Sequence, residues 1–310
     1  MPSFKSHLFA FILKHTRKKA FRSAEGLHAW IAKSRPTQDH RPPEKIAPRL
    51  AVETREVNGF PVYEVRAKGR QGSRRLLYLH GGAYCFEMTP FHWNLVAELA
   101  ERLDAHVTVP IYPLAPEHRF DDIYGMTRQV YRQVADEGGD FAIAGDSAGG
   151  NMALVLTMMA ASEGWPRPSR LALLSPGVDM TLTDPATREA AKTDPWLDIE
   201  GGRESVRIYA GDLDVADWRI SPAHGDLTAL PPTLIFSGTR DLLYPDTVTF
   251  ARKARQAGID VNLVVGEGMI HVWPLLPMPE ARTARDRMVT FLTSPTPPSS
   301  RPSKARAGTH

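Results

Sequence analysis

The sequence has a single cysteine and lacks any long apolar run. Cys85 has no second cysteine to pair with, so no internal disulfide can form within these 310 residues. Disulfides are rare in reducing compartments, and this cysteine usage fits the cytoplasmic location that we expect. No stretch of about 18 consecutive apolar residues occurs, so we expect no membrane-spanning helix.

The body of the chain carries a net negative charge. Residues 1–45 carry ten Lys and Arg against three Asp and Glu, and residues 294–310 carry three basic side chains and no acidic one. Since the formal net charge of the whole chain is +3, residues 46–293 carry −7. A nucleic-acid groove needs positive charge on the folded surface, so we set nucleic acid aside as a partner.

One stretch, FAIAGDSAGGNMALVLTM at residues 141–158, joins an apolar strand to an apolar helix through a serine with glycine on both sides. A turn as tight as GDSAG leaves no room for side chains at the positions two residues before and two residues after the serine. It pushes the Ser147 hydroxyl out at the carboxyl edge of a sheet, where the free N–H groups of the following helix also point. The pattern is that of the nucleophile elbow of α/β-hydrolases. The flanking strand and helix separate it from a chance glycine turn that serves packing only.

Short apolar strands alternate with amphipathic helices along most of the chain. We expect a hairpin of 51–57 and 61–67 around Asn58-Gly59, and further strands at 75–79, 107–111, 140–145, 171–175, 233–237 and 261–265. Helices are expected at 91–104, 121–136, 148–162, 246–257 and 278–292. This order predicts an α/β fold with a mostly parallel, doubly wound sheet of eight strands and a helical cap. Ligands then bind at the carboxyl ends of the strands.

The chain divides into three parts. Residues 1–48 are expected to form N-terminal cap helices and a linker, 49–293 the catalytic domain, and 294–310 a disordered Pro/Ser-rich tail. The interval 177–230 is too long for a loop and contains a helical stretch near 200–210, so we expect it to be a cap insertion above the strand ends.

The N-terminal segment has two interpretations. Phe4, Leu8, Phe11 and Ile12 fall at helical spacing and are followed by basic residues, so we expect a first helix here. A second helix is expected after Ser23. The two helices either pack over the active-site mouth or form a basic amphipathic segment on an anionic membrane. We favour packing, because Trp30 and Ile31 would otherwise be exposed.

A nucleophilic serine needs a base, and in α/β-hydrolases the order along the chain is serine, acid, histidine. Three histidines follow Ser147: His224, His271 and His310. His310 ends the tail, and His224 precedes the best acid. His271 follows the strand at 261–265 by a short loop, where a base should hang over the serine, so we assign it as the base.

The candidate acid follows the strand at 233–237. Asp241 lies immediately beyond the strand end, whereas Asp246 is better placed as the cap of the next helix. Asp179, after the strand at 171–175, is a second rival, since some hydrolases take the acid from that strand. We rank Asp241 first.

The oxyanion that develops on the substrate needs backbone donors already aimed at it. The apolar strand at 75–79 ends in His80-Gly81-Gly82-Ala83, whose glycines let the backbone approach a substrate oxygen. The N–H of Ala148, just after the serine, completes the set.

These segments together resemble the hormone-sensitive-lipase-like family of esterases, and within it the small bacterial acetyl-hydrolases and monoterpene lactone hydrolases. The resemblance rests on HGGAY at 80–84, YPLAPEHRF at 112–120, GDSAGGN at 145–151, TRD at 239–241 and His271, and it covers about residues 75–292. The chain departs from the family where Ala83 replaces a third glycine and where Asp241 is followed by Leu rather than Pro.

The resemblance implies site residues. The catalytic triad would be Ser147, Asp241 and His271. The oxyanion donors would be Gly82, Ala83 and Ala148, with Gly81 as a further one. His80 and Glu117 would hold the oxyanion loop by hydrogen bonds.

We therefore expect a serine carboxylester hydrolase that acts on short- to medium-chain, small-molecule esters through an acyl-enzyme, without metal or organic cofactor. The alternatives are hydrolysis of a lactone or small acetamide by the same triad, and a non-catalytic small-molecule binder on a hydrolase fold. A binder would be expected to lack a triad member, and here all three positions are filled. The sequence does not indicate the oligomeric state, for which a dimer is one candidate.

Overall fold

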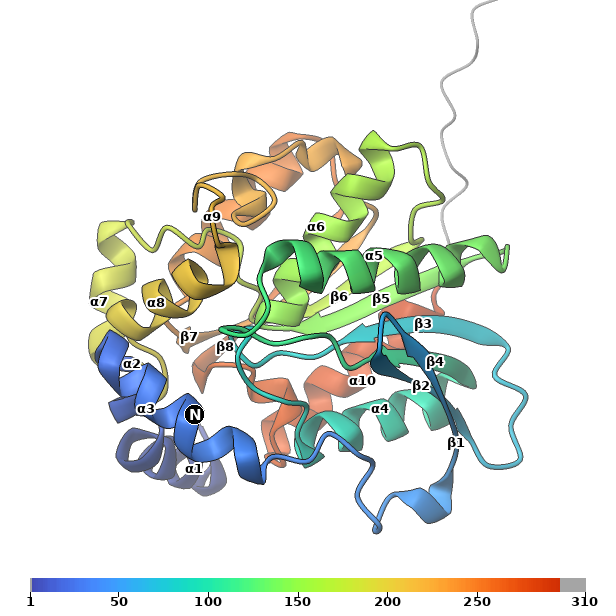
Figure 1. Ribbon diagram of the computed structural model, residues 1–310, viewed down its shortest axis with the longest axis horizontal. Coiled ribbons are helices and arrows are strands. Elements are labelled where there is room, and N and C mark those ends of the chain that lie inside the picture. Colours follow the sequence, from blue (N-terminus) through green and yellow to red (C-terminus); the bar gives the residue numbers. More distant parts are fainter. Residues whose placement is uncertain (1, 296–310) are drawn as a thin grey trace, which may run out of the picture.

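The structure, a computed structural model, describes residues 2–295. Its centre is a sheet of eight strands in the order β1-β2-β4-β3-β5-β6-β7-β8 (Figure 1). Strands β1, β2 and β4 pair antiparallel, and β3 to β8 run parallel. The strands are β1 (Leu50–Val57), β2 (Phe60–Ala67), β3 (Arg74–Leu79), β4 (Ala105–Pro110), β5 (Phe141–Asp146), β6 (Arg170–Leu174), β7 (Thr233–Arg240) and β8 (Val261–Ile270). The predicted mostly parallel, eight-stranded α/β fold is confirmed.

Ten α-helices surround the sheet in the described part of the chain: α1 (Phe4–Thr16), α2 (Lys18–Phe21), α3 (Ala24–Ser34), α4 (Pro90–Leu103), α5 (Phe120–Asp136), α6 (Ala148–Ser162), α7 (Pro185–Thr193), α8 (Ile199–Ala210), α9 (Tyr244–Gln256) and α10 (Pro279–Thr293). Five short 3₁₀ helices join them: η1 (Arg35–Thr37), η2 (Ala47–Arg49), η3 (Pro222–His224), η4 (Leu227–Ala229) and η5 (Trp273–Leu275). None of the helices within residues 2–295 combines the length and the apolar character that crossing a membrane requires.

The two faces of the sheet carry separate cores because side chains alternate along each strand. Leu77 and Ile143 face the layer of α5, α6 and α9, while Leu76 and Ala144 face α4 and α10 (Figure 1). Both layers exclude water from the central strands. The strand ends, and the loops that leave them, are thereby held at fixed positions.

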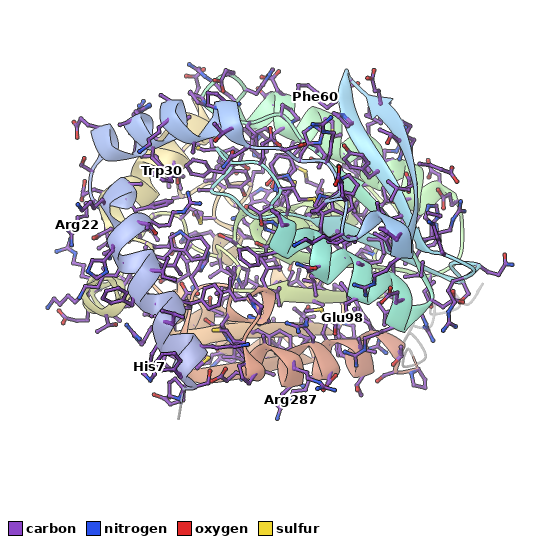
Figure 2. All side chains as sticks on the ribbon, turned by 90° about the horizontal axis from the view of Figure 1, so that it is seen from below. His7, Arg22, Trp30, Phe60, Glu98 and Arg287 are labelled. Atoms are coloured by element: carbon purple, nitrogen blue, oxygen red, sulfur yellow. The ribbon has the colours of Figure 1, made fainter. Side chains whose placement is uncertain are left out.

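The N-terminal helices lie at the carboxyl end of the sheet. There α2 and α3 pack against α8, and α7 adjoins them (Figure 1). Figure 2 shows these helices along one end of the molecule, with His7 and Arg22 on their outer side. The tail predicted at 294–310 lies outside the described residues from 296 onward.

Helix α1 turns a different face inward from the one that its apolar spacing indicated. Ser6 and Ala10 are buried and Phe9 and Leu13 half-buried, whereas the residues of the predicted apolar stripe are exposed: Phe4, Leu8, Phe11 and Ile12. Small residues let α1 approach the body of the protein closely. The four side chains of the predicted stripe remain largely exposed.

Two predicted details near the site are wrong. Strand β8 does not end at residue 265 but continues to Ile270, past a register shift opposite Gly238 and Arg240, so His271 follows the strand without a loop. Helix α9 begins at Tyr244, and Asp246 therefore lies in its first turn rather than at its cap.

Candidate active site

Ser147 lies between β5 and α6 with φ 52° and ψ −116°, a conformation that residues other than glycine rarely adopt. Its N–H donates to Leu174 O at 2.9 Å, which fixes the turn against β6. A Cβ on Gly145 would lie 2.6 Å from Gly149 O, and one on Gly149 would lie 2.0 Å from Leu79 O. Glycine is therefore required on both sides of the serine, as the sequence predicted.

Three side chains at the ends of β5, β7 and β8 form one hydrogen-bonded chain. His271 Nε2 lies 2.9 Å from Ser147 Oγ, and His271 Nδ1 lies 2.9 Å from Asp241 Oδ2. Both the histidine and the aspartate are buried. Because the Asp241 carboxylate only accepts, Nδ1–H donates to it and Nε2 is left to accept from the Ser147 hydroxyl. The structure thus brings together the three residues that the sequence singled out.

Charge around His271 favours its protonated form. Burial alone lowers the pKa of His271, but the carboxylates of Asp241, Asp194 and Asp146 outweigh it, and the pKa is raised above its ordinary value. A raised pKa strengthens the imidazole as a proton acceptor from the hydroxyl. It also makes the imidazole more readily protonated at mildly acidic pH.

The rival acids lie elsewhere. Asp179 Oδ2 is 3.2 Å from His224 Nε2, and its other oxygen accepts from Thr181. Asp246 accepts a hydrogen bond of 3.0 Å from the Thr187 hydroxyl, and burial raises its pKa to about 6. Neither carboxylate bonds to His271.

Unengaged backbone N–H groups surround the serine. The amides of Gly82 and Ala83 have no acceptor among the described residues, and Ala148 is the first residue of α6, so its N–H has no partner within the helix. Gly81 differs, because its N–H donates to Asp146 Oδ1 at 3.1 Å. The prediction that Gly81 is an oxyanion donor is therefore corrected: its amide is already used inside the protein.

The residue before the serine has a role that the sequence reasoning missed. Asp146 is buried, and its carboxylate accepts from Tyr78 Oη at 2.7 Å, from His92 Nε2 at 3.2 Å and from Gly81 N. Burial alone would raise the pKa of Asp146, but the charge and hydrogen bond of His92 and the hydroxyl of Tyr78 hold it below its ordinary value. This carboxylate ties the oxyanion loop to the elbow. Its place inside GDSAG was the available signal, but its partners come from β3 and α4.

The oxyanion loop has further supports. His80 Nδ1 donates to Gly81 O at 2.8 Å, and the Tyr112 hydroxyl donates to His80 O at 2.6 Å. Burial lowers the pKa of His80 to about 4, so it is neutral at pH 7. The role expected for Glu117 is wrong, because this exposed side chain pairs with Arg35 instead. The Ala115 N–H bonds the loop instead, donating to Tyr84 O at 2.9 Å.

A cavity of about 510 Å³ opens onto Ser147 and His271. Helices α1 to α3 supply one wall, and the segments after β3, α7 and β8 supply the others. Its apolar lining includes Phe9, Leu13, Trp30, Phe86, Trp196 and Leu276. No group of three or more His, Cys, Asp or Glu side chains within residues 2–295 is arranged to hold a metal ion.

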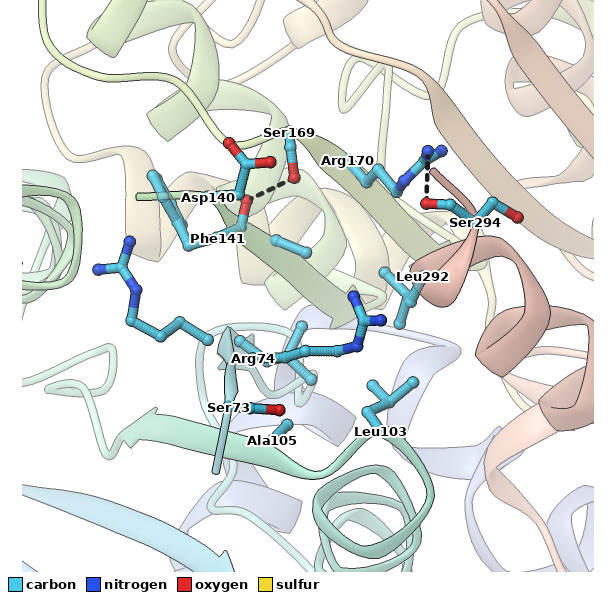
Figure 3. A pocket seen from close by; sticks show the side chains of 13 residues that line it. Ser73, Arg74, Leu103, Ala105, Asp140, Phe141, Ser169, Arg170, Leu292 and Ser294 are labelled. Atoms are coloured by element: carbon cyan, nitrogen blue, oxygen red, sulfur yellow. Dashed lines mark hydrogen bonds between the residues drawn. The ribbon is translucent and has the colours of Figure 1, made fainter. Parts of the chain in front are cut away.

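A second cavity, of about 220 Å³, lies at the opposite, amino edge of the sheet (Figure 3). Arg170 there donates to Pro295 O at 2.7 Å, and Arg75 donates to Gly139 O at 2.7 Å. Ser169 Oγ donates to Phe141 O at 3.0 Å. Among the residues that the structure describes, this lining contains serines but no histidine, so it offers no serine–histidine pair.

Fold, elbow and hydrogen-bonded chain together define an α/β-hydrolase. Residues 76–275 match the family described as alpha/beta hydrolase fold, and the chain belongs to this family. An esterase of Acinetobacter venetianus is 32% identical over 253 residues, which cover 80% of this chain and 83% of that protein. An acetyl-hydrolase of Streptomyces hygroscopicus is 32% identical over 234 residues, which cover 73% and 78%.

Solved structures of esterases have a similar fold. An esterase/lipase from an uncultured bacterium superposes with a TM-score of 0.80 at 29% identity, covering 94% of this chain and 98% of that one. An esterase from the bacterial hormone-sensitive lipase family gives a TM-score of 0.78 at 27% identity, with the same coverage. The resemblance to hormone-sensitive-lipase-like esterases is thereby confirmed.

Proposed function

We propose that this carboxylester hydrolase works through Ser147, His271 and Asp241. Ser147 Oγ attacks the ester carbonyl while His271 Nε2 takes the hydroxyl proton. Asp241 fixes the imidazole and stabilises its protonated form. The N–H groups of Gly82, Ala83 and Ala148 stabilise the oxyanion. The observation that carries the proposal is the continuous chain of 2.9 Å contacts from Ser147 through His271 to Asp241.

Collapse of the first tetrahedral intermediate breaks the bond to the alcohol, which leaves with the proton from His271. The acyl group remains on Ser147 as an ester. Water then attacks this acyl-enzyme while His271 takes its proton, and the carboxylic acid is released with Ser147 restored.

Partitioning of the acyl-enzyme tests this mechanism. Esters with one acyl group and different leaving alcohols are hydrolysed in water containing methanol, and the ratio of methyl ester to free acid is measured. A shared acyl-enzyme predicts one ratio for p-nitrophenyl, phenyl and vinyl acetate. Ratios that follow the leaving group would contradict the intermediate.

We propose short- to medium-chain esters as substrates, because the cavity of about 510 Å³ is apolar along most of its wall. Lactones and small acetamides are the second candidate, since the same donors and nucleophile serve them. A panel of p-nitrophenyl esters from acetate to laurate, γ- and δ-lactones and acetanilides ranks the three classes by kcat/KM. Preference for a lactone or an amide would replace the ester assignment.

We propose that α1 to α3 and residues 177–230 act as a cap. The supporting contacts are Lys18 Nζ, which donates to Ala191 O at 2.9 Å, and His28 Nε2, which lies 2.6 Å from Glu204 Oε1. Phe9 lines the cavity while Phe11 faces solvent, which provides a matched pair. Phe9→Ala should change the ratio of kcat/KM between octanoate and acetate esters, and Phe11→Ala should not. Equal, small effects would contradict the cap.

The outer face of α1 supports a further part of the proposal, contact with an anionic membrane. Phe4 is 81% and Phe11 62% exposed, and Lys5 and Lys14 are exposed on the same helix. Apolar side chains beside cations are typical of a helix that lies in a lipid interface. Co-sedimentation with vesicles containing phosphatidylserine should show binding that Phe11→Ala weakens and salt reverses. No binding at low salt would rule the contact out.

We also propose a cytoplasmic location. The support is the use of one cysteine, Cys85, which is free and buried. Fractionation of the source cells with an antibody to the protein tests it. Recovery outside the cytoplasm would contradict it.

A further inference from the structure

The segment between α7 and α8, residues 194–198, contacts the candidate triad at His271 and at the turn after Asp241. It begins with Asp194, which is buried although it is not one of the three triad residues. Asp194 Oδ1 accepts from Trp196 N at 2.6 Å and from Leu197 N at 2.9 Å. Its Oδ2 accepts from Leu242 N at 2.7 Å. All three donors are backbone amides of residues close to His271 or Asp241.

The first consequence concerns the turn that holds Asp241. Leu242 is its neighbour in the chain, and Asp241 Oδ1 in turn accepts from Leu243 N at 2.9 Å. Asp194 therefore binds the first amide of the short turn, that of Leu242, and Asp241 binds the next one, that of Leu243. A carboxylate that orients a histidine needs a rigidly held backbone of this kind.

The second consequence concerns His271 itself. The Trp196 ring meets the imidazole edge to face, with centroids 5.7 Å apart and an interplanar angle of 87°. The Trp196 amide is one of the groups bound by Asp194. One carboxylate thus secures both the acid beside the imidazole and the aromatic ring against it.

Charged side chains from several elements lie around residues 194–198 and His271. On the outer side of the segment, Lys18 of α2 pairs with Asp198 at 3.1 Å and donates to Ala191 O at 2.9 Å. Arg240, at the end of β7, donates to Thr193 O at 3.5 Å. The acidic groups that act on His271 are Asp241, Asp194 and Asp146. Burial, with the charge of Asp241 acting in the same direction, raises the pKa of Asp194 to about 6, while its three backbone N–H donors favour the ionised form.

We propose that Asp194 is a positioning residue for the candidate triad: it holds Trp196 and the Asp241 turn around His271, and its charge favours the imidazolium that forms during the reaction. The inference rests on the proposed function of His271 as the base. A carboxylate that only caps a turn would stabilise the fold without altering how His271 titrates.

Asp194→Asn tests the proposal, with Asp198→Asn as the matched control four residues away. Asp194→Asn removes the charge and one acceptor, and we expect kcat to fall about 10- to 100-fold through loss of alignment. Removing a negative charge also lowers the pKa of His271, so the acid limb of the kcat/KM profile should move to lower pH. Asp198→Asn should move neither quantity. An Asp194→Asn enzyme that folds, with kcat and acid limb unchanged, would overturn the proposal.

A second variant, Trp196→Ala, tests the proposal even if Asp194→Asn does not fold. Trp196→Ala keeps the backbone amides that bind Asp194, and removal of the ring should lower kcat on p-nitrophenyl acetate by about threefold or more. Unchanged kcat in Trp196→Ala would overturn the positioning role. Ser147→Ala, assayed in parallel, separates the two claims: if it is inactive while the Asp194 and Trp196 variants behave like wild type, only the positioning role fails.

Discussion

The two cavities lie at opposite edges of the sheet and adjoin the same central strands, β3 and β5, yet a helix N-terminus borders one and a helix C-terminus borders the other. At the carboxyl edge, the N-terminus of α6 presents N–H groups beside Ser147. At the amino edge, α10 ends, and Arg170 binds the carbonyls of Ser294 and Pro295. Helix N-termini stabilise anions and helix C-termini stabilise cations. Both edges contain serines, but at the carboxyl edge Ser147 lies beside free helix N–H groups and bonds to His271, whereas the serines of the amino edge lie beside arginines at the end of α10.

The largest expected effect separates the two serines. Ser147→Ala should lower kcat by about 10⁴-fold or more, because it removes the nucleophile of a group that acts as a unit. Ser169→Ala, at the amino edge, removes only a hydrogen bond to Phe141 O and should leave kcat nearly unchanged. Ester hydrolysis rates and circular dichroism of both variants provide the comparison. Near-native turnover by Ser147→Ala would remove the basis of the mechanism.

The next effect concerns the acid. Asp241→Asn should reduce kcat by about 10²- to 10⁴-fold, since an amide favours the wrong tautomer of His271. Asp179→Asn and Asp246→Asn serve as controls and should have much smaller effects, because neither carboxylate touches His271. A larger loss at Asp179 than at Asp241 would transfer the acid to the strand before.

The pH dependence of kcat/KM measures how the carboxylates around His271 shift its pKa. His271 must be neutral to accept a proton, and its raised pKa means that the protonated, inactive form persists to higher pH than for an isolated histidine. We expect kcat/KM to fall about tenfold per pH unit below that pKa, with the midpoint above about 6.5. A midpoint well below this value would show that the surrounding carboxylates do not act as described.

The smallest expected effect on activity belongs to the amino edge. Arg170→Ala leaves the carbonyls at the end of α10 without their donor and removes a contact with the Phe291 ring. We expect the free energy of unfolding to fall by about 1–3 kcal/mol, with kcat nearly unchanged. Urea denaturation and initial rates measure the two quantities. A loss of kcat in a fully folded variant would contradict the separation of the edges.

The same comparison explains what the sequence could predict. The elbow, Asp241 and His271 follow strand ends whose apolar runs can be read locally, and the short-range clashes at Gly145 and Gly149 require the glycines. The partners of Asp146 could not be predicted, since Tyr78 and His92 come from distant elements.

Long-range packing also accounts for the other differences between the predictions from the sequence and the structure. The buried face of α1 depends on the body that Ser6 and Ala10 approach, and the apolar stripe through Phe4 and Phe11 gave the opposite face. The extension of β8 depends on pairing with β7, so the loop expected before His271 was wrong. Asp194 lies in an interval of the sequence that carries no motif.

The central claim, that Ser147 is the nucleophile, is tested most directly by mapping a covalent adduct. The protein is treated with a fluorophosphonate, digested and analysed by mass spectrometry, in parallel with Ser147→Ala and Ser169→Ala. The account predicts one phosphonylated residue, Ser147, with full loss of activity, the same adduct in Ser169→Ala and none in Ser147→Ala. Stoichiometric labelling at another residue, or full activity in a protein labelled at Ser147, would contradict it.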